Sequence, residues 1–135
     1  MTLTAEQKRQ TAQKHYNASL GECPARQLLE TISSKWVSLI MLALEGGQLR
    51  HSDLRRQIPG ASQKMLTSTL RSLERDGLVS RHVTAQVPVR TDYGLTPRGR
   101  SLLRIVFQLK EWAEENMDAV ASSRMEHDLD KLAVN

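Results

Sequence analysis

The stretch over residues 52–77, SDLRRQIPGASQKMLTSTLRSLERDG, contains two helix-forming segments separated by a turn. Ser52 predicts the N-terminal cap of a short helix over 53–57, and the Pro-Gly pair that follows this helix predicts a tight turn. Ser62 predicts the cap of a longer helix that runs to Asp76, because the glycine after Asp76 ends it. A short helix, a tight turn and a longer helix together predict a helix-turn-helix.

The longer helix has two faces of different chemistry. Its apolar face, which repeats about every 3.6 residues, comprises Met65, Leu66, Leu70 and Leu73. Its opposite face has no acidic residue and no large apolar one, and it comprises Gln63, Lys64, Thr67, Ser68 and Arg71. Such donors and short hydroxyls hydrogen-bond base edges and phosphates, so this face is the predicted DNA contact. Alternatives stay open for Lys64 as an ordinary exposed lysine and for Arg71 as an ion-pair partner of Glu74.

After the glycine that ends this helix, the apolar repeat changes from about 3.6 residues to two. Residues 78–84 and 90–95 predict two strands joined by a turn. Two strands directly after such a helix form a hairpin wing, whose Arg81 and Arg90 are candidates to contact phosphates or a minor groove.

Positive charge is concentrated in the middle of the chain. Residues 50–100 carry ten Lys or Arg and four Asp or Glu, a net charge of +6, whereas the whole chain carries +4. Local basicity of this kind is typical of polyanion binding, with a solvated basic face as the alternative. Within this region Arg55 and Arg56 of the short helix are candidates for phosphate contact, and a solvated charge is the alternative for each.

The flanking segments predict further helices. Residues 4–17 predict a polar helix or arm, Pro24 suits the first turn of a second helix, and 36–44 predict the most apolar helix of the core. Thr96 and the proline after it predict the start of a long last helix that ends near Val120. Apolar residues occupy more than one side of that helix, so it needs two partners. A homodimer is predicted, with a thicker monomer core that includes the N-terminal helix as the alternative.

The predicted fold is therefore mainly α with a small β-hairpin wing (α+β), a winged helix-turn-helix with terminal dimerisation helices. We expect an N-terminal helix or arm over 1–22 and a winged domain over 23–121 that includes the C-terminal dimerisation helix. Residues 122–135 form a polar tail that is either disordered or an extra helix. A length of 135 residues with 39% hydrophobic residues suits a single globular domain.

The sequence lacks the residue patterns that are typical of several other classes of function. No nucleophile–base–acid pattern, glycine-rich phosphate loop or carboxylate pair is present, so no enzyme is predicted. The four histidines and one cysteine lack metal-ligand spacing, so no metal and no cofactor are predicted. The longest mostly apolar run, 36–44, is shorter than the about 20 residues that span a bilayer, and the N-terminus lacks the apolar region of a signal peptide. We therefore expect a cytoplasmic protein with no membrane partner.

Six short motifs in order resemble the HxlR-type branch of winged-helix regulators, which is related in shape to the MarR group. They are Cys-Pro at 23–24, Ser-Lys-Trp at 34–36, Ser-Asp-Leu-Arg-Arg at 52–56, Pro-Gly-Ala-Ser-Gln-Lys-Met-Leu at 59–66, Leu-Arg-Ser-Leu-Glu-Arg-Asp-Gly-Leu-Val at 70–79 and Tyr-Gly-Leu-Thr-Pro-Arg-Gly at 93–99. The resemblance implies a homodimeric transcription regulator on a pseudo-palindromic DNA operator, with Ser62 to Arg71 in the major groove. The chain departs from the pattern at His51, where the family usually has an aromatic residue, and at Thr91-Asp92.

Cys23 immediately precedes the helix that begins at Pro24. A helix N-terminus favours an anionic group and so favours a thiolate, and some members of the resembling family use a cysteine here to sense oxidants or electrophiles. The alternative is a small, half-buried, inert thiol. Because the chain has one cysteine, a disulfide would form with a second subunit or with a small thiol.

Two functions from different classes stay open at this point. A sequence-specific DNA-binding transcription regulator is the first, and a winged-helix protein-interaction module that does not bind DNA is the alternative. The sequence does not specify an operator, the sign of regulation or a small-molecule effector.

Overall fold

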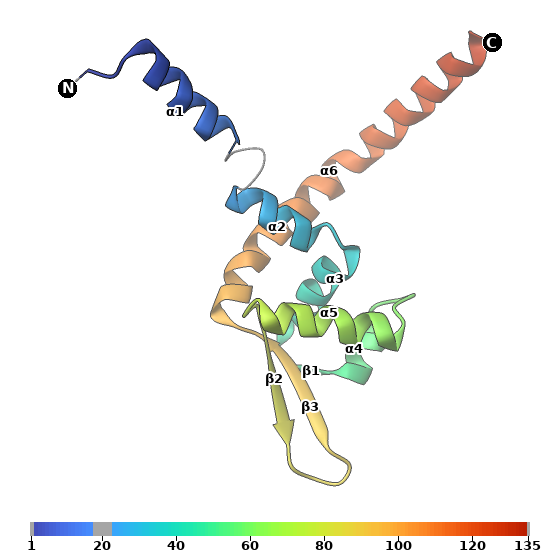
Figure 1. Ribbon diagram of the computed structural model, residues 1–135. Coiled ribbons are helices and arrows are strands. Elements are labelled where there is room, and N and C mark those ends of the chain that lie inside the picture. Colours follow the sequence, from blue (N-terminus) through green and yellow to red (C-terminus); the bar gives the residue numbers. More distant parts are fainter. Residues whose placement is uncertain (1, 18–22, 135) are drawn as a thin grey trace. The chain divides into compact units, whose positions relative to one another are not determined.

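The computed structural model describes residues 2–17 and 23–134. In chain order the elements are α1 (Ala5–Asn17), α2 (Pro24–Ile32), α3 (Lys35–Ala43), the 3-10 turn η2 (Leu44–Gly46), β1 (Leu49–Arg50), α4 (His51–Gln57), α5 (Gln63–Arg75), β2 (Val79–Thr84), β3 (Arg90–Leu95) and α6 (Pro97–Ala133) (Figure 1). The chain divides into two compact units, one up to Leu39 and one from Ile40 onward. The second unit contains the helix-turn-helix, the wing and α6.

The first unit begins with the polar helix α1, whose side chains are exposed over residues 5–14. Helix α2 begins after Cys23 with Pro24 in its first turn, as the sequence predicts, and none of its residues is buried. Trp36 and Val37 at the start of α3 are buried.

A three-stranded antiparallel sheet in the order β1-β3-β2 forms the wing and its base. Val79 lies opposite Leu95, and Thr84 lies opposite Arg90, so β2 and β3 pair along their whole length. The predicted hairpin is confirmed, with β2 starting at Val79, one residue later than expected. The third strand, β1, pairs with β3 beside Tyr93 and Asp92, where the sequence had indicated only an extended link.

The core of the second unit lies behind α5. Helix α4 packs against α5, β1 and β3, while α5 packs against β2 and α6 packs against β3. The side chains that are most completely buried in this unit are Ile40, Met41, Leu44, Leu54, Leu66, Leu70, Leu73 and Val79. Helix α6 approaches the start of β2 at Gly99, where an added Cβ would lie 2.0 Å from the carbonyl oxygen of Leu78, so only glycine fits there.

The structure corrects the expected start of the short helix. Helix α4 begins at His51 rather than Asp53, so Ser52 is inside the helix and is not its cap. The carboxylate of Asp53 accepts a hydrogen bond from the backbone N–H of Arg50 at 3.2 Å. This bond satisfies a free donor at the helix start and moves that start two residues toward the N-terminus.

Met65 is a second correction. It was predicted on the apolar face of α5, but its side chain is 43% exposed. Successive residues of a helix are rotated by about 100°, so Met65 lies away from the inward direction that Leu66, Leu70 and Leu73 share.

The end of the last helix is the third correction. Helix α6 does not end near Val120 but continues to Ala133, through most of the expected polar tail. No glycine or proline follows Gly99 in the sequence, so nothing in the chain interrupts the helical hydrogen bonds.

Candidate nucleic-acid interface

Helix α5 is held at both ends by local signals. The hydroxyl of Ser62 accepts a hydrogen bond from the backbone N–H of Met65 at 3.1 Å, which confirms the predicted cap. After the helix, Gly77 adopts φ +73°, a left-handed conformation that glycine takes without strain. Leu66, Leu70 and Leu73 are buried, so the opposite face of the helix points outward.

The outward face of α5 forms an open groove of about 630 Å³. The residues that line this groove are the five predicted from the sequence, Gln63, Lys64, Thr67, Ser68 and Arg71. Thr67 is half-buried and the other four are exposed. The groove therefore contains amide, ammonium, guanidinium and hydroxyl groups and no carboxylate.

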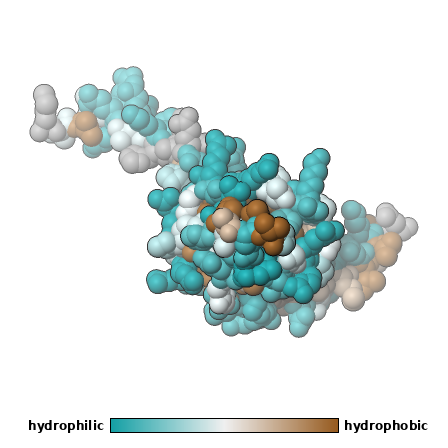
Figure 2. Space-filling model, turned by 90° about the horizontal axis from the view of Figure 1, so that it is seen from below, coloured by the Kyte–Doolittle hydropathy of each residue, from teal (hydrophilic) through white to brown (hydrophobic). Residues whose placement is uncertain are grey.

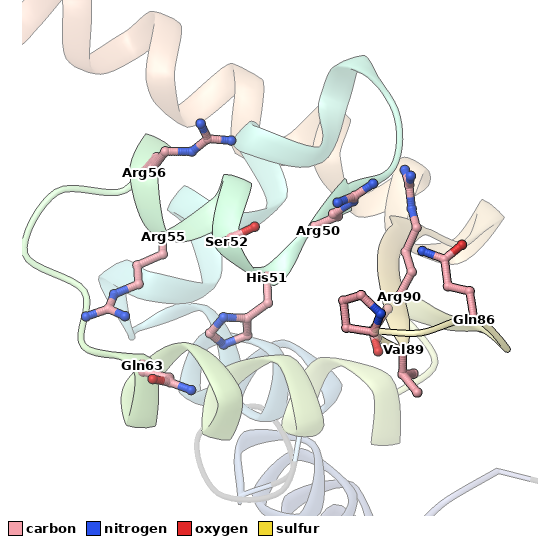
Figure 3. Close-up of a pocket in the computed structure, with 11 residues that line it drawn as sticks. Arg50, His51, Ser52, Arg55, Arg56, Gln63, Gln86, Val89 and Arg90 are labelled. Atoms are coloured by element: carbon pink, nitrogen blue, oxygen red, sulfur yellow. The ribbon is translucent and has the colours of Figure 1, made fainter.

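A larger concavity of about 840 Å³ lies between α4, the start of α5 and the wing. Its lining comprises Arg50, His51, Ser52, Arg55, Arg56, Gln63, Gln86, Pro88, Val89, Arg90 and Thr91 (Figure 3). In this view Arg55 extends from α4 toward Gln63, while the side chains of Arg50 and Arg90 lie near each other beside the wing (Figure 3). Four arginines from three elements thus line one concave surface, which we call the arginine concavity.

Three of the predicted arginines have acidic neighbours. The Nε atom of Arg90 donates to Asp92 Oδ2 at 2.9 Å, and Arg81 Nε lies 3.6 Å from Glu74 Oε2. Arg56 donates to the carboxylate of Asp53. Glu74 therefore pairs with Arg81 and not with Arg71, which was the alternative for Arg71.

Other basic side chains of the α5 groove and the arginine concavity remain available to bind an anion. Among the residues that the structure describes, Lys64, Arg71 and Arg55 make no ion pair within 4.0 Å. Arg71 and Arg81 line a small third hollow with Glu74 and Arg75, at the end of α5 nearest β2. Positive groups consequently run from α4 along α5 to the wing.

The ionisation of the Asp53 carboxyl group is perturbed by its neighbours. Its pKa is lowered from its ordinary value of 3.8, first by the backbone N–H of Arg50 and next by the guanidinium of Arg56. Both donors favour the carboxylate form. Asp53 therefore stays ionised and stabilises the first turn of α4.

The wing adds a mixed surface. Its valines at the hairpin end, Val83, Val87 and Val89, are exposed. Seen from below, the face at the wing end is mostly hydrophilic and contains one small hydrophobic group (Figure 2).

Sequence reasoning missed several contributors to this surface. Arg50, Ser52 and Gln86 line the arginine concavity, and none of them was predicted. His51 also lines it, and its Nε2 atom lies 3.1 Å from the hydroxyl of Thr67 on α5. The one available signal was the presence of histidine where the resembling family usually has an aromatic residue.

Cys23 lies in the first unit as the N-terminal cap of α2. Its Sγ atom accepts a hydrogen bond from the backbone N–H of Arg26 at 3.3 Å, and the residue is half-buried. No group of three or more His, Cys, Asp or Glu in the described part of the chain is arranged to hold a metal ion. None of the described helices is long and apolar enough to cross a membrane.

A recognition helix with an outward donor-rich face, followed by an antiparallel hairpin, defines a winged helix-turn-helix. The HxlR-like helix-turn-helix family matches residues 31–121, and the chain belongs to this family. It is a family of transcriptional regulators and not of enzymes, and its helix-turn-helix implies DNA binding.

Individual relatives agree with this assignment. The HTH-type transcriptional regulator YtfH of Escherichia coli is 41% identical over 113 residues, which cover 84% of this chain and 90% of YtfH. The solved structure of the regulator ytfH from Salmonella typhimurium has a TM-score of 0.70 at 41% identity and covers 76% of this chain and 92% of that one.

Two further solved structures extend the comparison. The redox regulator HypR in its reduced form has a TM-score of 0.71 at 42% identity, covering 74% of this chain and 99% of HypR. A MarR-family regulator from Porphyromonas gingivalis has a TM-score of 0.67 at 35% identity, covering 71% of this chain and 94% of that one. The expected similarity in shape to the MarR group is confirmed.

Proposed function

We propose that this protein is a homodimeric, sequence-specific regulator that inserts α5 into the major groove of a pseudo-palindromic operator. The observation that carries the proposal is the groove on α5, whose five predicted residues point outward while three leucines anchor the opposite face. In helix-turn-helix proteins the N-terminal residues of the recognition helix contact base edges. Gln63 and Lys64 occupy that end of α5, so they are the proposed base contacts.

Backbone contacts are proposed for the arginines around α5. Arg55 lines the arginine concavity and Arg71 lies further along α5, both positioned beside the proposed major-groove contact. Arg56, Arg81 and Arg90 are paired with carboxylates. The pairs of Arg56 and Arg81 are exposed, and exposed ion pairs contribute only about 0–1 kcal/mol, so exchanging these carboxylates for a phosphate costs little. The pair of Arg90 with Asp92 is part-buried, but the Arg90 side chain is itself 41% exposed. These three arginines remain proposed phosphate or minor-groove contacts.

Dimerisation is proposed through α6. Leu102, Leu103 and Val106 of this helix are buried within the unit, whereas Trp112 is 57% exposed. The other exposed large apolar side chains of α6 are Ile105, Leu109, Met117, Met125, Leu129 and Leu132. A long helix with this much exposed apolar surface calls for a partner, and a second copy would pair two recognition helices across a two-fold axis. We expect a DNA-binding regulator of this kind to act in the cytoplasm.

The test is fluorescence anisotropy of the purified protein on DNA from upstream of its own gene and on scrambled DNA, across a salt series. We expect tighter binding to the upstream duplex and a steep loss of affinity for both duplexes as salt rises. Lys64→Ala is expected to weaken the preference for the upstream duplex, whereas Lys110→Ala on α6 serves as the matched control and leaves it unchanged. Absence of binding at low salt would contradict the proposal and favour a protein-interaction module.

We also propose that Cys23 makes the regulator responsive to oxidants. Its Sγ atom accepts a backbone N–H at the start of α2 and the residue is only half-buried, and the structurally similar HypR is described as a redox regulator with reduced and oxidised forms. Diamide would take two electrons and two protons from the thiols of Cys23 and of a second subunit or a small thiol, which then form one disulfide.

The response is measured as loss or gain of DNA affinity after diamide treatment, together with non-reducing electrophoresis. We expect the wild-type protein to respond and the Cys23→Ser variant to be insensitive. An unchanged response in Cys23→Ser would show that this cysteine is an inert cap.

A further inference from the structure

His51 forms a hydrogen bond between the two helices of the helix-turn-helix. It is the first residue of α4, and its Nε2 atom lies 3.1 Å from Thr67 Oγ1, 16 residues along the chain on α5. Within the described residues this is the one hydrogen bond between side chains of α4 and α5. In Figure 3 the imidazole of His51 points from α4 toward α5.

Thr67 is a central member of the outward face of α5. It lines the groove with Lys64, Ser68 and Arg71, and it is half-buried while these neighbours are exposed. Its hydroxyl thus contacts His51 on one side and borders the proposed DNA-contacting groove on the other.

We propose that His51 is a positioning residue that orients the Thr67 hydroxyl and thereby sets which base is preferred opposite Thr67. This inference rests on the proposed insertion of α5 into the major groove. A threonine hydroxyl has one donor and two acceptor lone pairs, so a hydroxyl that is free to rotate accepts or donates toward any base. Once the imidazole uses the O–H donor or one lone pair of this hydroxyl, fewer hydrogen-bonding groups are left to contact DNA.

The direction of the bond follows from the tautomer of His51. If Nε2 carries the proton, it donates to Thr67 Oγ1, and the threonine O–H is free to donate to an acceptor such as guanine N7 or thymine O4. If Nε2 is unprotonated, it accepts the threonine O–H, and Thr67 then only accepts from an amino group of adenine or cytosine. An unprotonated Nε2 thus makes Thr67 an acceptor only, whereas a protonated Nε2 fixes the directions of the threonine O–H and of its one remaining lone pair.

A purely structural role for His51 predicts different behaviour. An imidazole that only filled the space between α4 and α5 would be replaced well by phenylalanine. His51→Phe keeps a ring but removes the hydrogen bond, His51→Gln keeps an amide for bonding without the ring, and Thr67→Val keeps the shape of residue 67 without its hydroxyl. His82→Phe is the matched control, because His82 is exposed on β2 and its side chain contacts, among the described residues, the hydroxyl of Ser80 at 3.3 Å.

The experiment uses the full chain and selects preferred sites from duplexes with randomised sequence. Binding is then compared between the selected duplex and duplexes changed at one base pair. We expect His51→Phe and Thr67→Val to lose about 3- to 10-fold of preference at the same base pair, which is the effect of one hydrogen bond. The double variant should lose no more than either single variant, because the two residues act as one unit. His51→Gln should retain most of the preference, and His82→Phe should retain all of it.

Two results would overturn the inference. The first is a His51→Phe protein that keeps the preference that Thr67→Val loses. The second is a His51→Phe protein that loses affinity equally for every duplex. Thermal unfolding monitors whether each variant folds, and Thr67→Val with His51→Gln decides the question if His51→Phe is unstable. A wild-type protein that selects no sequence at all would instead contradict the proposed function itself.

Discussion

Helices α5 and α6 each bury one face in the core of the second unit, but their outer faces differ in chemistry. Both helices place leucines in the core of the second unit, Leu66, Leu70 and Leu73 from α5, and Leu102 and Leu103 from α6. The outer face of α5 is a groove of donors without an acidic side chain, whereas α6 exposes Trp112 and a series of aliphatic side chains. The contrast indicates two kinds of partner, a polyanion for α5 and an apolar protein surface for α6.

The largest effect on stability is expected from a substitution in the buried face, which is the feature that α5 and α6 have in common. Leu70→Ala removes a side chain that is 1% exposed and should lower the free energy of unfolding by about 2–5 kcal/mol. Met65→Ala, on the same helix but outside the core, should change it by only about 0.5 kcal/mol. Urea unfolding followed by circular dichroism measures both values, and equal losses would mean that the two faces of α5 are not distinct.

The outer face of α6 is tested by Trp112→Ala. An interface aromatic of this size typically contributes about 2 kcal/mol or more, so the dimer dissociation constant should rise at least about 30-fold. Sedimentation velocity over a concentration series measures the change, and Glu115→Ala at an exposed polar position of α6 is the control. A wild-type protein that is monomeric at micromolar concentration would contradict dimerisation through α6.

The proposed polyanion contact beside α5 is tested by Arg55→Ala. Loss of one phosphate contact should weaken binding to all duplexes alike and should reduce the steepness of the salt dependence by about one unit. The measurement is the slope of log affinity against log salt for wild-type and variant proteins. A variant that instead changes base preference, with an unchanged slope, would reassign Arg55 from phosphate to base contact.

The smallest effect concerns the start of α4. The pKa of Asp53 is lowered in the folded protein, so its stabilising effect is present above the unfolded value of about 3.9 and is lost as pH falls through the lower folded value. Asp53→Asn should therefore be less stable than wild type at pH 6 and nearly equal to it at pH 2. Urea midpoints at the two pH values test this, with Asp118→Asn on α6 as the control. A difference that persists unchanged at pH 2 would assign the effect of Asp53 to something other than its charge.

Local sequence signals predicted the recognition helix well. Ser62 caps α5 and the glycine at 77 ends it, and the three leucines that are spaced for one face are buried. These signals act over a few residues, so they survive without knowledge of the rest of the chain. The five outward residues followed from the same spacing, because a helix with a buried face exposes the opposite one.

Local signals failed where two capping residues competed and where a change of composition was taken as the end of a helix. The carboxylate of Asp53 accepts a hydrogen bond from the backbone N–H of Arg50. This hydrogen bond outweighed the capping tendency of Ser52 and lengthened α4. The expected end of α6 near Val120 was also wrong, because composition changes there while nothing breaks the helix.

The sequence alone determined the class of fold, the bounds of α5 and the hairpin to within one residue, and the donor-rich face of the recognition helix, because caps, glycines and apolar periods are encoded within single elements. Only the tertiary structure brought Arg50 and Arg90 to one concave surface, since that arrangement depends on the pairing of β1 with β3 across about 40 residues of chain. It alone placed the imidazole of His51 against Thr67, because that contact requires α4 to pack on α5. Contacts between elements depend on how their buried faces fit together, and no local pattern specifies that fit.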